Sequence, residues 1–446
     1  MSTLVTDSLR RSLLKMAGPT MIGALLQSAQ WFIDLYWVGG LGTEAVAAIS
    51  VGGILTMTLF PVIMGLSTGT MAIISRAIGA GNQDEAADTA GQSLTLGLLV
   101  GLLTGFLGFV YAGDLCRYLG ATPEVAALGK DYLEIYFLFS FTLFVMLMCS
   151  SIFQGVGDSY HPMIATLIAT SLNAVLAPIL IYGLWGFPAV GIKGAAIATV
   201  ISQGLAAAVL MFHIYKGRAR IHVSLARLKL RRDLVKRIVG IGLPSSGQML
   251  ARNLIGLILL KIVSRYGTAA VAAYGIGMRF HMTMLMPAFV LGNSVAPIVG
   301  QNLGAGKPER SSAAAWLATG IDLAVKVVIA TILVAWASSL VSCFDTNHEV
   351  VTEGKAYLRI ITPFLLFAGI AIVLGRALQG AGDVVAPMVA TVISLWGIQL
   401  PLALLLPHYF NLNINGVWWA ISIATVVHGL MIWVWFQTGR WKHKKV

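Results

Sequence analysis

Long apolar stretches of about 20 to 25 residues alternate along the chain with short polar turns, and each stretch is long enough to cross roughly 30 Å of hydrocarbon as a helix. Every backbone polar group in lipid needs a partner within the protein, so these stretches are predicted to be transmembrane helices. The alternation typical of a membrane β-barrel is absent. We count about twelve stretches, at 16–38, 47–72, 89–112, 132–154, 162–184, 189–215, 238–264, 275–300, 313–343, 357–379, 386–408 and 415–437.

The second half of the chain repeats the first at a shift of 225 residues, as from Pro19 to Pro244. Each half holds an even number of stretches, which predicts a parallel repeat. We therefore expect an all-α integral membrane protein with twelve transmembrane helices in two pseudo-symmetric six-helix lobes, an architecture typical of a carrier. The matched positions are mostly turn residues and include Gly42 with Gly267, Gly79-Ala80-Gly81 with Gly304-Ala305-Gly306, Tyr132 with Tyr357, Gln154-Gly155 with Gln379-Gly380, Gly157-Asp158 with Gly382-Asp383, and Gly204 with Gly429.

Composition supports a membrane location, because 57% of the residues are hydrophobic and 11% are charged. The sequence contains no GxxxxGK[ST] loop for ATP and no HExxH zinc motif, and no paired catalytic residues are apparent. The three cysteines have no spacing that suggests metal binding or a redox pair. We expect a protein that is not an enzyme, needs no cofactor and is driven by an ion gradient.

The net charge of +12 comes from basic residues placed between and beyond the apolar stretches, above all in 216–237 and after 437. Cytoplasmic loops carry such an excess, so both termini are expected in the cytoplasm, and a nucleic-acid partner is not expected. No cleaved signal peptide is evident, so the first helix should be retained. The predicted parts are an N-terminal lobe at 1–215, a basic cytoplasmic linker at 216–237, a C-terminal lobe at 238–437 and a basic tail at 438–446.

Asp34 is the sharpest functional candidate, because an ionisable residue inside a span is costly. Gln27, Gln30 and Asp34 share one helix face, which should line a cavity in the first lobe. A carboxylate in poorly hydrated surroundings resists ionisation and can act as a proton carrier. The alternative is a structural aspartate paired within the bundle. Position 259 of the repeat is leucine, so the acid is not a feature of the scaffold.

Other polar residues in the spans are weaker candidates. Asn173 and Thr199 could hydrogen-bond Asp34 or a bound ion, or could simply join helices. Asp322 and Lys326 are four residues apart and are expected to neutralise one another. The basic residues Arg252, Lys261, Arg279, His281 and Arg376 are candidates for snorkelling, lobe packing or substrate gating.

Two further groups complete the candidate site. Pro19 and Gly23 are positions at which the first helix can bend at low cost. Methionine and aromatic side chains suit bulky hydrophobic ligands, although contact with lipid explains most such residues. The expected substrate-cavity residues are Gln27, Gln30, Trp31, Tyr36 and Met57.

The sequence resembles the multidrug and toxic compound extrusion (MATE) family, specifically its DinF-like branch, over nearly the whole chain. The resemblance rests on short motifs in a fixed order: Gly18-Pro19, the run Asp34 to Val38, Gly40-Leu41-Gly42 followed by Ala45 to Ala48, Gly79-Ala80-Gly81-Asn82, Gln154 to Asp158, Asn173, and Gly194-Ala195-Ala196 leading to Thr199.

The resemblance implies export of cationic aromatic compounds in exchange for protons or sodium ions. It makes Asp34 the coupling acid, with Asn173, Ala195 and Thr199 around it, and it associates a bend at Pro19 with protonation. Many members carry a second acid four residues after the asparagine, where this chain has Ala177. The acids of the sodium-coupled branch in the seventh and tenth helices are also missing, so protons are the favoured coupling ion.

The expected protein is therefore a proton-driven multidrug exporter of amphipathic, mostly cationic compounds. It is expected to work as a monomer in the bacterial inner membrane by alternating access of its two lobes. Two alternatives stay open, namely a sodium-coupled drug antiporter and a flippase for a lipid-linked oligosaccharide. Flippases usually need a basic cavity, for which Arg252 and Arg376 are the candidates.

Overall fold

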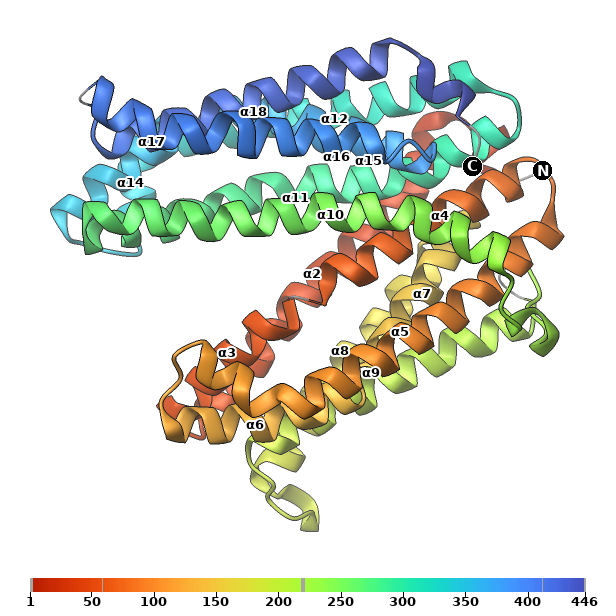
Figure 1. Ribbon diagram of the computed structural model, residues 1–446, viewed down its shortest axis with the longest axis horizontal. Helices are drawn as coiled ribbons and strands as arrows, with labels where there is room; N and C mark the ends of the chain where they lie inside the picture. The colour runs from red at the N-terminus through yellow and green to blue at the C-terminus, as the bar shows by residue number, and fades with distance from the viewer. Residues whose placement is uncertain (1–2, 58, 218–220, 411, 445–446) are drawn as a thin grey trace. The chain divides into compact units, whose positions relative to one another are not determined.

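The structure, a computed structural model, describes residues 3–57, 59–217, 221–410 and 412–444. Over these ranges it is built from helices, and none of the described residues lies in a strand (Figure 1). Arg218 and Arg220 of the predicted linker, and Lys445 of the predicted tail, lie outside these ranges. Contacts divide the chain into two compact units, Leu14–Leu243 and Thr3–Leu13 with Pro244–Val446.

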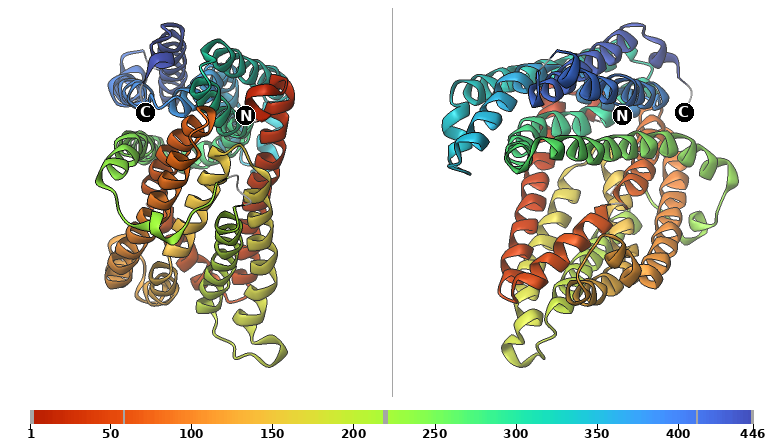
Figure 2. Two further views of the ribbon diagram at one scale, coloured as in Figure 1. Left: turned by 90° about the vertical axis from the view of Figure 1, so that its right-hand side faces the viewer. Right: turned by 60° about the vertical axis from the view of Figure 1, so that its left-hand side comes forward.

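The first unit contains most of α2 and the helices that follow it as far as the start of α10. The pairs α8 with α9, α5 with α6, α4 with α7 and α5 with α7 pack against one another (Figures 1 and 2). The bounds are α2 Leu9–Gly39, α3 Thr43–Met57, α4 Phe60–Gly79, α5 Gln83–Tyr118, α6 Pro123–Leu138, α7 Phe141–Gly155, α8 Tyr160–Tyr182 and α9 Ile192–Tyr215, with a short 3-10 helix, η2, at Leu225–Leu228.

The second unit contains most of α10 and the helices after it, together with the short α1 at Thr3–Thr6. Its main packed pairs are α11 with α15, α11 with α12, α15 with α18 and α17 with α18. The bounds are α10 Arg232–Val263, α11 Thr268–Gly304, α12 Pro308–Ala335, α13 Ala337–Ser342, α14 His348–Ile361, α15 Leu365–Gly380, α16 Val385–Val392, a π-helical segment η5 Ile393–Gln399, α17 Leu400–Tyr409 and α18 Ile414–Gln437.

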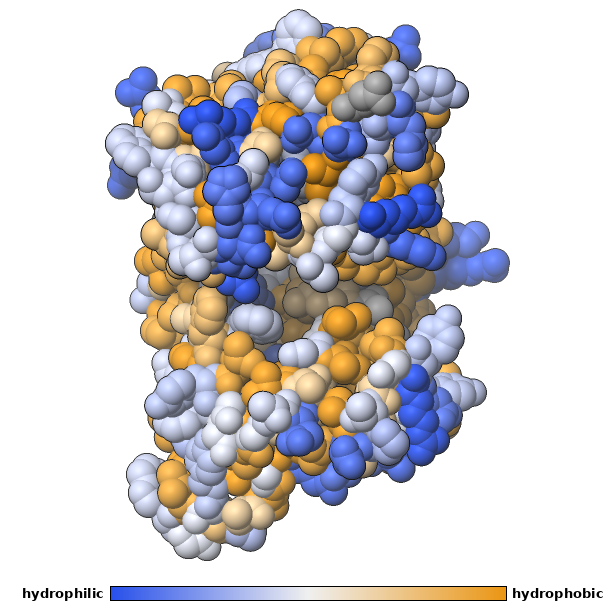
Figure 3. Space-filling model, turned by 90° about the vertical axis from the view of Figure 1, so that its left-hand side faces the viewer, coloured by the Kyte–Doolittle hydropathy of each residue, from blue (hydrophilic) through white to orange (hydrophobic). Residues whose placement is uncertain are grey.

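The predicted spans correspond to these helices. Among the described residues, 10 helical segments are long and apolar enough to cross a membrane, and the pair α6 and α7 brings the number to 11. The remaining predicted span is α2, a 31-residue helix whose apolar character is diluted by Gln27, Gln30 and Asp34. The face in Figure 3, which looks at the left-hand side of the view in Figure 1, carries hydrophobic and hydrophilic residues side by side. The predicted all-α fold of two six-helix lobes is confirmed.

The span predicted at 132–154 is a broken helix, which differs from the expectation of one continuous element. Helices α6 and α7 meet at a bend of 48°. At the break, the Ser140 hydroxyl donates to the carbonyl oxygen of Gly101 on α5 at 3.1 Å. Gly105 of α5 also lies against the backbone of α6, since a Cβ atom there would lie 2.5 Å from the Phe137 oxygen. The glycines of α5 therefore let the backbone of the broken span approach closely.

The 225-residue repeat is visible in the packing inside each unit. A Cβ atom on Gly155 would lie 3.3 Å from the Met71 carbonyl oxygen, and one on Gly380 would collide with the carbonyl oxygen of Ala296, the repeat partner of Met71. Two further pairs of glycines have repeat-related neighbours. Gly52 lies against Tyr132 as Gly277 lies against Tyr357, and Gly204 lies against Thr142 as Gly429 lies against Phe367. Equivalent helices thus pack through equivalent glycines in both units.

The unit boundaries differ from the predicted lobes at two places. The N-terminal segment packs with the second unit, where Asn302 Nδ2 donates to the Leu4 oxygen at 3.3 Å and Arg310 donates to the Asp7 oxygen. The linker packs with the first unit, and the division falls at Leu243/Pro244 inside α10. A continuous α10, which begins at Arg232, joins the linker to the second unit.

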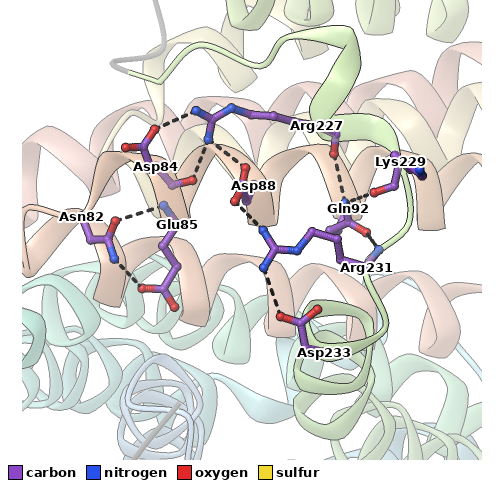
Figure 4. Close-up of polar contacts among 9 residues, drawn as sticks. All are labelled: Asn82, Asp84, Glu85, Asp88, Gln92, Arg227, Lys229, Arg231 and Asp233. Atoms are coloured by element: carbon purple, nitrogen blue, oxygen red, sulfur yellow. Dashed lines mark hydrogen bonds and ion pairs between the residues drawn. The ribbon is translucent and has the colours of Figure 1, made fainter.

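The linker is held on α5 by ion pairs (Figure 4). Arg227 contacts Asp84 at 2.7 Å and Asp88 at 2.8 Å, and Arg231 contacts Asp88 at 2.9 Å. The hydrogen bond with Asp84 raises the pKa of Arg227 above its ordinary value. Gln92 adds backbone contacts, because its Nε2 donates to the Arg227 oxygen at 3.0 Å. Residues 227–231 of the basic linker are therefore held against the first unit.

Candidate functional site

Asp34 lies in the C-terminal half of α2, and its helix face points at α8. One turn earlier on the same face, Gln30 Oε1 accepts a hydrogen bond of 3.3 Å from Thr170 of α8. Asp34 itself interacts with the side chain of Asn173, three residues further along α8. The predicted Gln30–Asp34 face is therefore turned toward the interior of the first unit.

Asn173 connects Asp34 to α9. Its Nδ2 donates to Thr199 Oγ1 at 3.0 Å, and Thr199 Oγ1 donates to the carbonyl oxygen of Ala195 at 2.9 Å. Asn173 is fully buried and Thr199 nearly so. The four residues predicted to couple to an ion, Asp34, Asn173, Thr199 and Ala195, thus form one contiguous polar chain across α2, α8 and α9.

Two oxygens in this chain have no hydrogen-bond partner among the described residues. They are Oδ1 of Asp34 and Oδ1 of Asn173, and both are buried. An ionised carboxylate only accepts hydrogen bonds, whereas a protonated one also donates. A proton on Asp34 would therefore supply the donor that these two acceptors lack, and leaving a buried acceptor unpaired costs about 1 to 3 kcal/mol.

An apolar cluster joins the C-terminal end of α2 to α8 and α9. It contains Val38 of α2, Ala177 and Ile181 of α8, and Ala195 and Ala198 of α9, all nearly or fully buried. Ala177 stands where many family members have a second acid, and here it belongs to this cluster. Small side chains let the three helices approach closely here.

Sequence reasoning missed three contributors to this site. Tyr132 and Tyr136 of α6 lie near enough to Asp34 for a negative charge on either ring oxygen to repel the carboxylate, and Tyr136 hydrogen-bonds Gln203 of α9. Tyr132 was visible as a repeat position matched by Tyr357, but the repeat indicates scaffold rather than function. Thr170 is the third, and its spacing of three residues from Asn173 was an available signal.

The remaining predicted residues take no part in this chain. Gln27, Trp31, Tyr36 and Met57 are exposed, so their assignment to a substrate cavity stays a prediction. Helix α2 runs without interruption through Pro19 and Gly23. A Cβ atom on Gly23 would meet nothing within 4 Å, so packing does not require a glycine there. No cluster of three or more potential metal ligands is found in the described part of the chain.

Two helical repeats long and apolar enough to span a membrane, with a half-buried acid in the first, define a polytopic membrane carrier. The pattern of the MatE family matches the chain twice, at 19–179 and 244–405, and the two matches begin 225 residues apart, as the internal repeat does. The chain therefore belongs to the multidrug and toxic compound extrusion (MATE) family. It is a transporter and not an enzyme.

Relatives cover nearly the full length of the chain. A probable multidrug resistance protein, YoeA of Bacillus subtilis, is 29% identical over 98% of this chain and 96% of the relative. An FAD transporter of Shewanella oneidensis is 26% identical over 96% of this chain and 94% of the relative. A crystal structure of a MATE protein in the bent conformation superimposes with a TM-score of 0.92 at 25% identity, covering 98% and 96% of the two chains.

Proposed function

We propose that this protein exports amphipathic, mostly cationic organic compounds in exchange for protons, by alternating access of its two lobes. The supporting observation is the buried, unpaired Oδ1 of Asp34 beside the unpaired Oδ1 of Asn173. Family membership and relatives named as multidrug resistance proteins support the export of drugs.

Protonation changes what this site can bind. With Asp34 ionised, the carboxylate offers a negative charge that attracts a cation, while Oδ1 of Asp34 and Oδ1 of Asn173 are left without a donor. With Asp34 protonated, its O–H donates to Asn173 Oδ1, and the charge is gone. Exchange follows, because a proton and a cationic substrate compete for the same carboxylate.

Sodium is the weaker coupling candidate. Na⁺ favours several hard oxygen ligands, and carboxylates are the strongest of these in proteins. Here Asp34 is the single carboxylate of the chain of contacts, because position 177 is alanine, and the Thr199 hydroxyl oxygen already accepts a hydrogen bond from Asn173.

The test uses purified protein in liposomes loaded with ethidium, with proton and sodium gradients imposed separately. We expect a proton gradient alone to drive ethidium transport, and Asp34→Asn to abolish it. Asp114→Asn is the matched control, because Asp114 is an exposed acid of the same unit. Wild-type rates in Asp34→Asn would refute the coupling role, and transport driven by a sodium gradient alone would refute the choice of ion.

We also propose that the protein lies in the bacterial inner membrane with both termini in the cytoplasm, and that it functions as a monomer. The proposal follows from the basic linker and tail, whose side chains suit the cytoplasmic surface. One chain carries both lobes, so a second copy is not needed to complete the carrier.

A further inference from the structure

The second unit holds basic side chains that are buried or half-buried inside its spans. They come from five helices, namely Arg252 of α10, His281 of α11, Lys326 of α12, Arg376 of α15 and His428 of α18. Lys326 is matched, because its Nζ lies 2.6 Å from Asp322 Oδ2 and both side chains are fully buried. The charges of Arg252 and Arg376 have no such match.

Arg376 starts a continuous hydrogen-bonded chain across the second unit. Its Nη1 donates to Gln379 Oε1 at 3.0 Å, and Gln379 Nε2 donates to Gln248 Oε1 at 2.9 Å. Gln248 Nε2 then donates to Thr391 Oγ1 at 2.9 Å, and Thr391 lies 3.2 Å from His428 Nε2. Four helices, α15, α10, α16 and α18, are joined in this way.

The packing of α11 leaves room for the Arg376 side chain at the start of these hydrogen bonds. A Cβ atom on Gly292 of α11 would lie 2.9 Å from Arg376 Cγ, so the glycine leaves room for the arginine stem. The partners of the guanidinium are neutral, since the Gln379 side chain supplies a dipole and no charge. Arg376 is therefore positioned but not neutralised.

Arg252 lies one helical turn after Gln248 on α10 and belongs to the same cluster. It interacts electrostatically with His281, Arg376 and His428. Within the ranges that the structure describes, its side chain forms neither a hydrogen bond nor an ion pair. Its backbone is fixed, because Trp396 Nε1 of the π-helical segment donates to the neighbouring Ala251 oxygen at 3.2 Å.

An unmatched pair of guanidinium groups is costly inside a membrane span. Arginine cannot shed its proton at physiological pH, so the charge must be solvated or paired. Water would solvate each group, but it would leave their mutual repulsion in place. An anion with two or three oxygens removes both costs, because guanidinium groups bind such oxygens in a bidentate way.

We propose that the second unit binds a phosphate or carboxylate group of an amphipathic molecule at Arg252 and Arg376. The anionic oxygens contact the two guanidinium groups, and Gln248 and Gln379 hold Arg376 in place. This site goes beyond proton-driven export of cations and does not rest on it, because it uses other residues in the other unit. It admits substrates or lipids that carry a negative charge.

The test measures binding of 1-naphthyl phosphate to the purified full-length protein by calorimetry, with uncharged 1-naphthol as the matched probe. We expect the phosphate to bind more tightly than 1-naphthol, and its binding to weaken as NaCl is raised. Arg252→Gln should raise the Kd for the phosphate by about tenfold or more, since a charged hydrogen-bonded contact is lost. Lys261→Gln is the control on the same helix, because Lys261 is exposed.

Arg252→Lys is the control for misfolding. It keeps the positive charge but loses the bidentate contact, so its Kd should lie between those of the wild type and Arg252→Gln. Equal binding of 1-naphthol and 1-naphthyl phosphate, or equal Kd values for Arg252→Gln and Lys261→Gln, would overturn the proposal. Nanodiscs with and without phosphatidylglycerol separate the two sources of the anion. If phosphatidylglycerol weakens the binding of 1-naphthyl phosphate and Arg252→Gln removes this effect, the site binds a lipid head group. If 1-naphthyl phosphate binds equally well with and without phosphatidylglycerol, the site binds a soluble ligand. No ion gradient is used, so the result is independent of Asp34.

Discussion

At the scale of single residues, Asn173 is the link on which the proposed coupling depends. Asn173→Ala removes the side chain that interacts with Asp34 and donates to Thr199. Hydrogen bonds to charged groups contribute about 1.5 to 3 kcal/mol, so we expect proton-driven ethidium transport to fall by about tenfold or more. Initial transport rates in liposomes measure the effect.

Thr166→Ala is the control for this substitution. It removes a hydroxyl of the same helix that donates to the Pro162 oxygen at 3.0 Å, and it leaves Asp34 and Asn173 together. Most of the transport rate should remain. If Asn173→Ala transports at the wild-type rate while Asp34→Asn does not, Asp34 acts without its asparagine neighbour. The proposal that protonated Asp34 donates to Asn173 would then be wrong.

The buried pair of Asp322 and Lys326 gives a second residue-level prediction. Lys326→Met leaves a fully buried carboxylate without its partner, and such losses cost about 3 to 5 kcal/mol. The double variant Asp322→Leu/Lys326→Met removes both charges and should recover most of the stability. Thermal unfolding in detergent compares the two. A double variant no more stable than Lys326→Met would show that the pair is needed for more than charge balance.

The residues of the first-unit site could be predicted because Asp34 is a charged outlier in an apolar span, and the mutual neutralisation of Asp322 and Lys326 followed from their spacing. The structure brings Asp34 together with Asn173 and pairs Asp322 with Lys326, while the coupling role of Asp34 stays a prediction. Tyr132 and Tyr136 could not be found this way, because buried tyrosines in a membrane helix are indistinguishable from packing residues. The partners of Arg376 also stayed hidden, since Gln248 and Gln379 come from helices whose pairing no short motif encodes.

At the scale of elements, the linker is a structural part of the first unit rather than a loose tether. Asp88 of α5 holds both Arg227 and Arg231, so Asp88→Asn should release the segment while leaving every basic cleavage site for trypsin in place. We expect cleavage within 216–237 to become several-fold faster. Limited proteolysis of the purified protein followed by mass spectrometry measures the rate.

Salt provides an independent check on the same contacts. The Arg227 and Arg231 pairs are partly exposed, so raising NaCl should speed the cleavage of the wild-type linker but change little in Asp88→Asn. Glu124→Gln, an exposed acid at the start of α6, is the control substitution. Equal cleavage of Asp88→Asn and wild type at low salt would mean that Gln92 and the backbone contacts suffice to hold the linker.

Element boundaries were predicted well where hydrophobicity alone decides them and poorly where neighbouring helices do. The apolar spans at 162–184 and 415–437 correspond to α8 and α18 within a few residues. The break between α6 and α7 depends on close approach to the glycines of α5, a contact about 35 residues away in sequence, and hydropathy carries no sign of it. The docking of the linker depends likewise on charges of α5.

At the scale of the whole molecule, the internal repeat and the family pattern agree, and both support a transporter with six spans per repeat. A parallel repeat places the linker and both termini on one side of the membrane and the loops after odd-numbered spans on the other. The repeat does not say which of the two sides is the cytoplasm. That assignment follows from the distribution of basic residues, and it can be tested directly.

Cys343 makes the sidedness testable without adding a probe. It is exposed in the connection between α13 and α14, after the ninth span, whereas Cys116 and Cys149 are buried. With a cytoplasmic N-terminus, Cys343 faces the outside, so a membrane-impermeant maleimide should label it in intact spheroplasts, and Cys343→Ser should abolish the labelling. A cysteine placed in the tail by Thr438→Cys, in the Cys343→Ser background, should react only after the membrane is permeabilised. Labelling of the tail in intact cells would invert the topology, and with it the direction in which the Asp34 carboxylate would exchange protons for substrate.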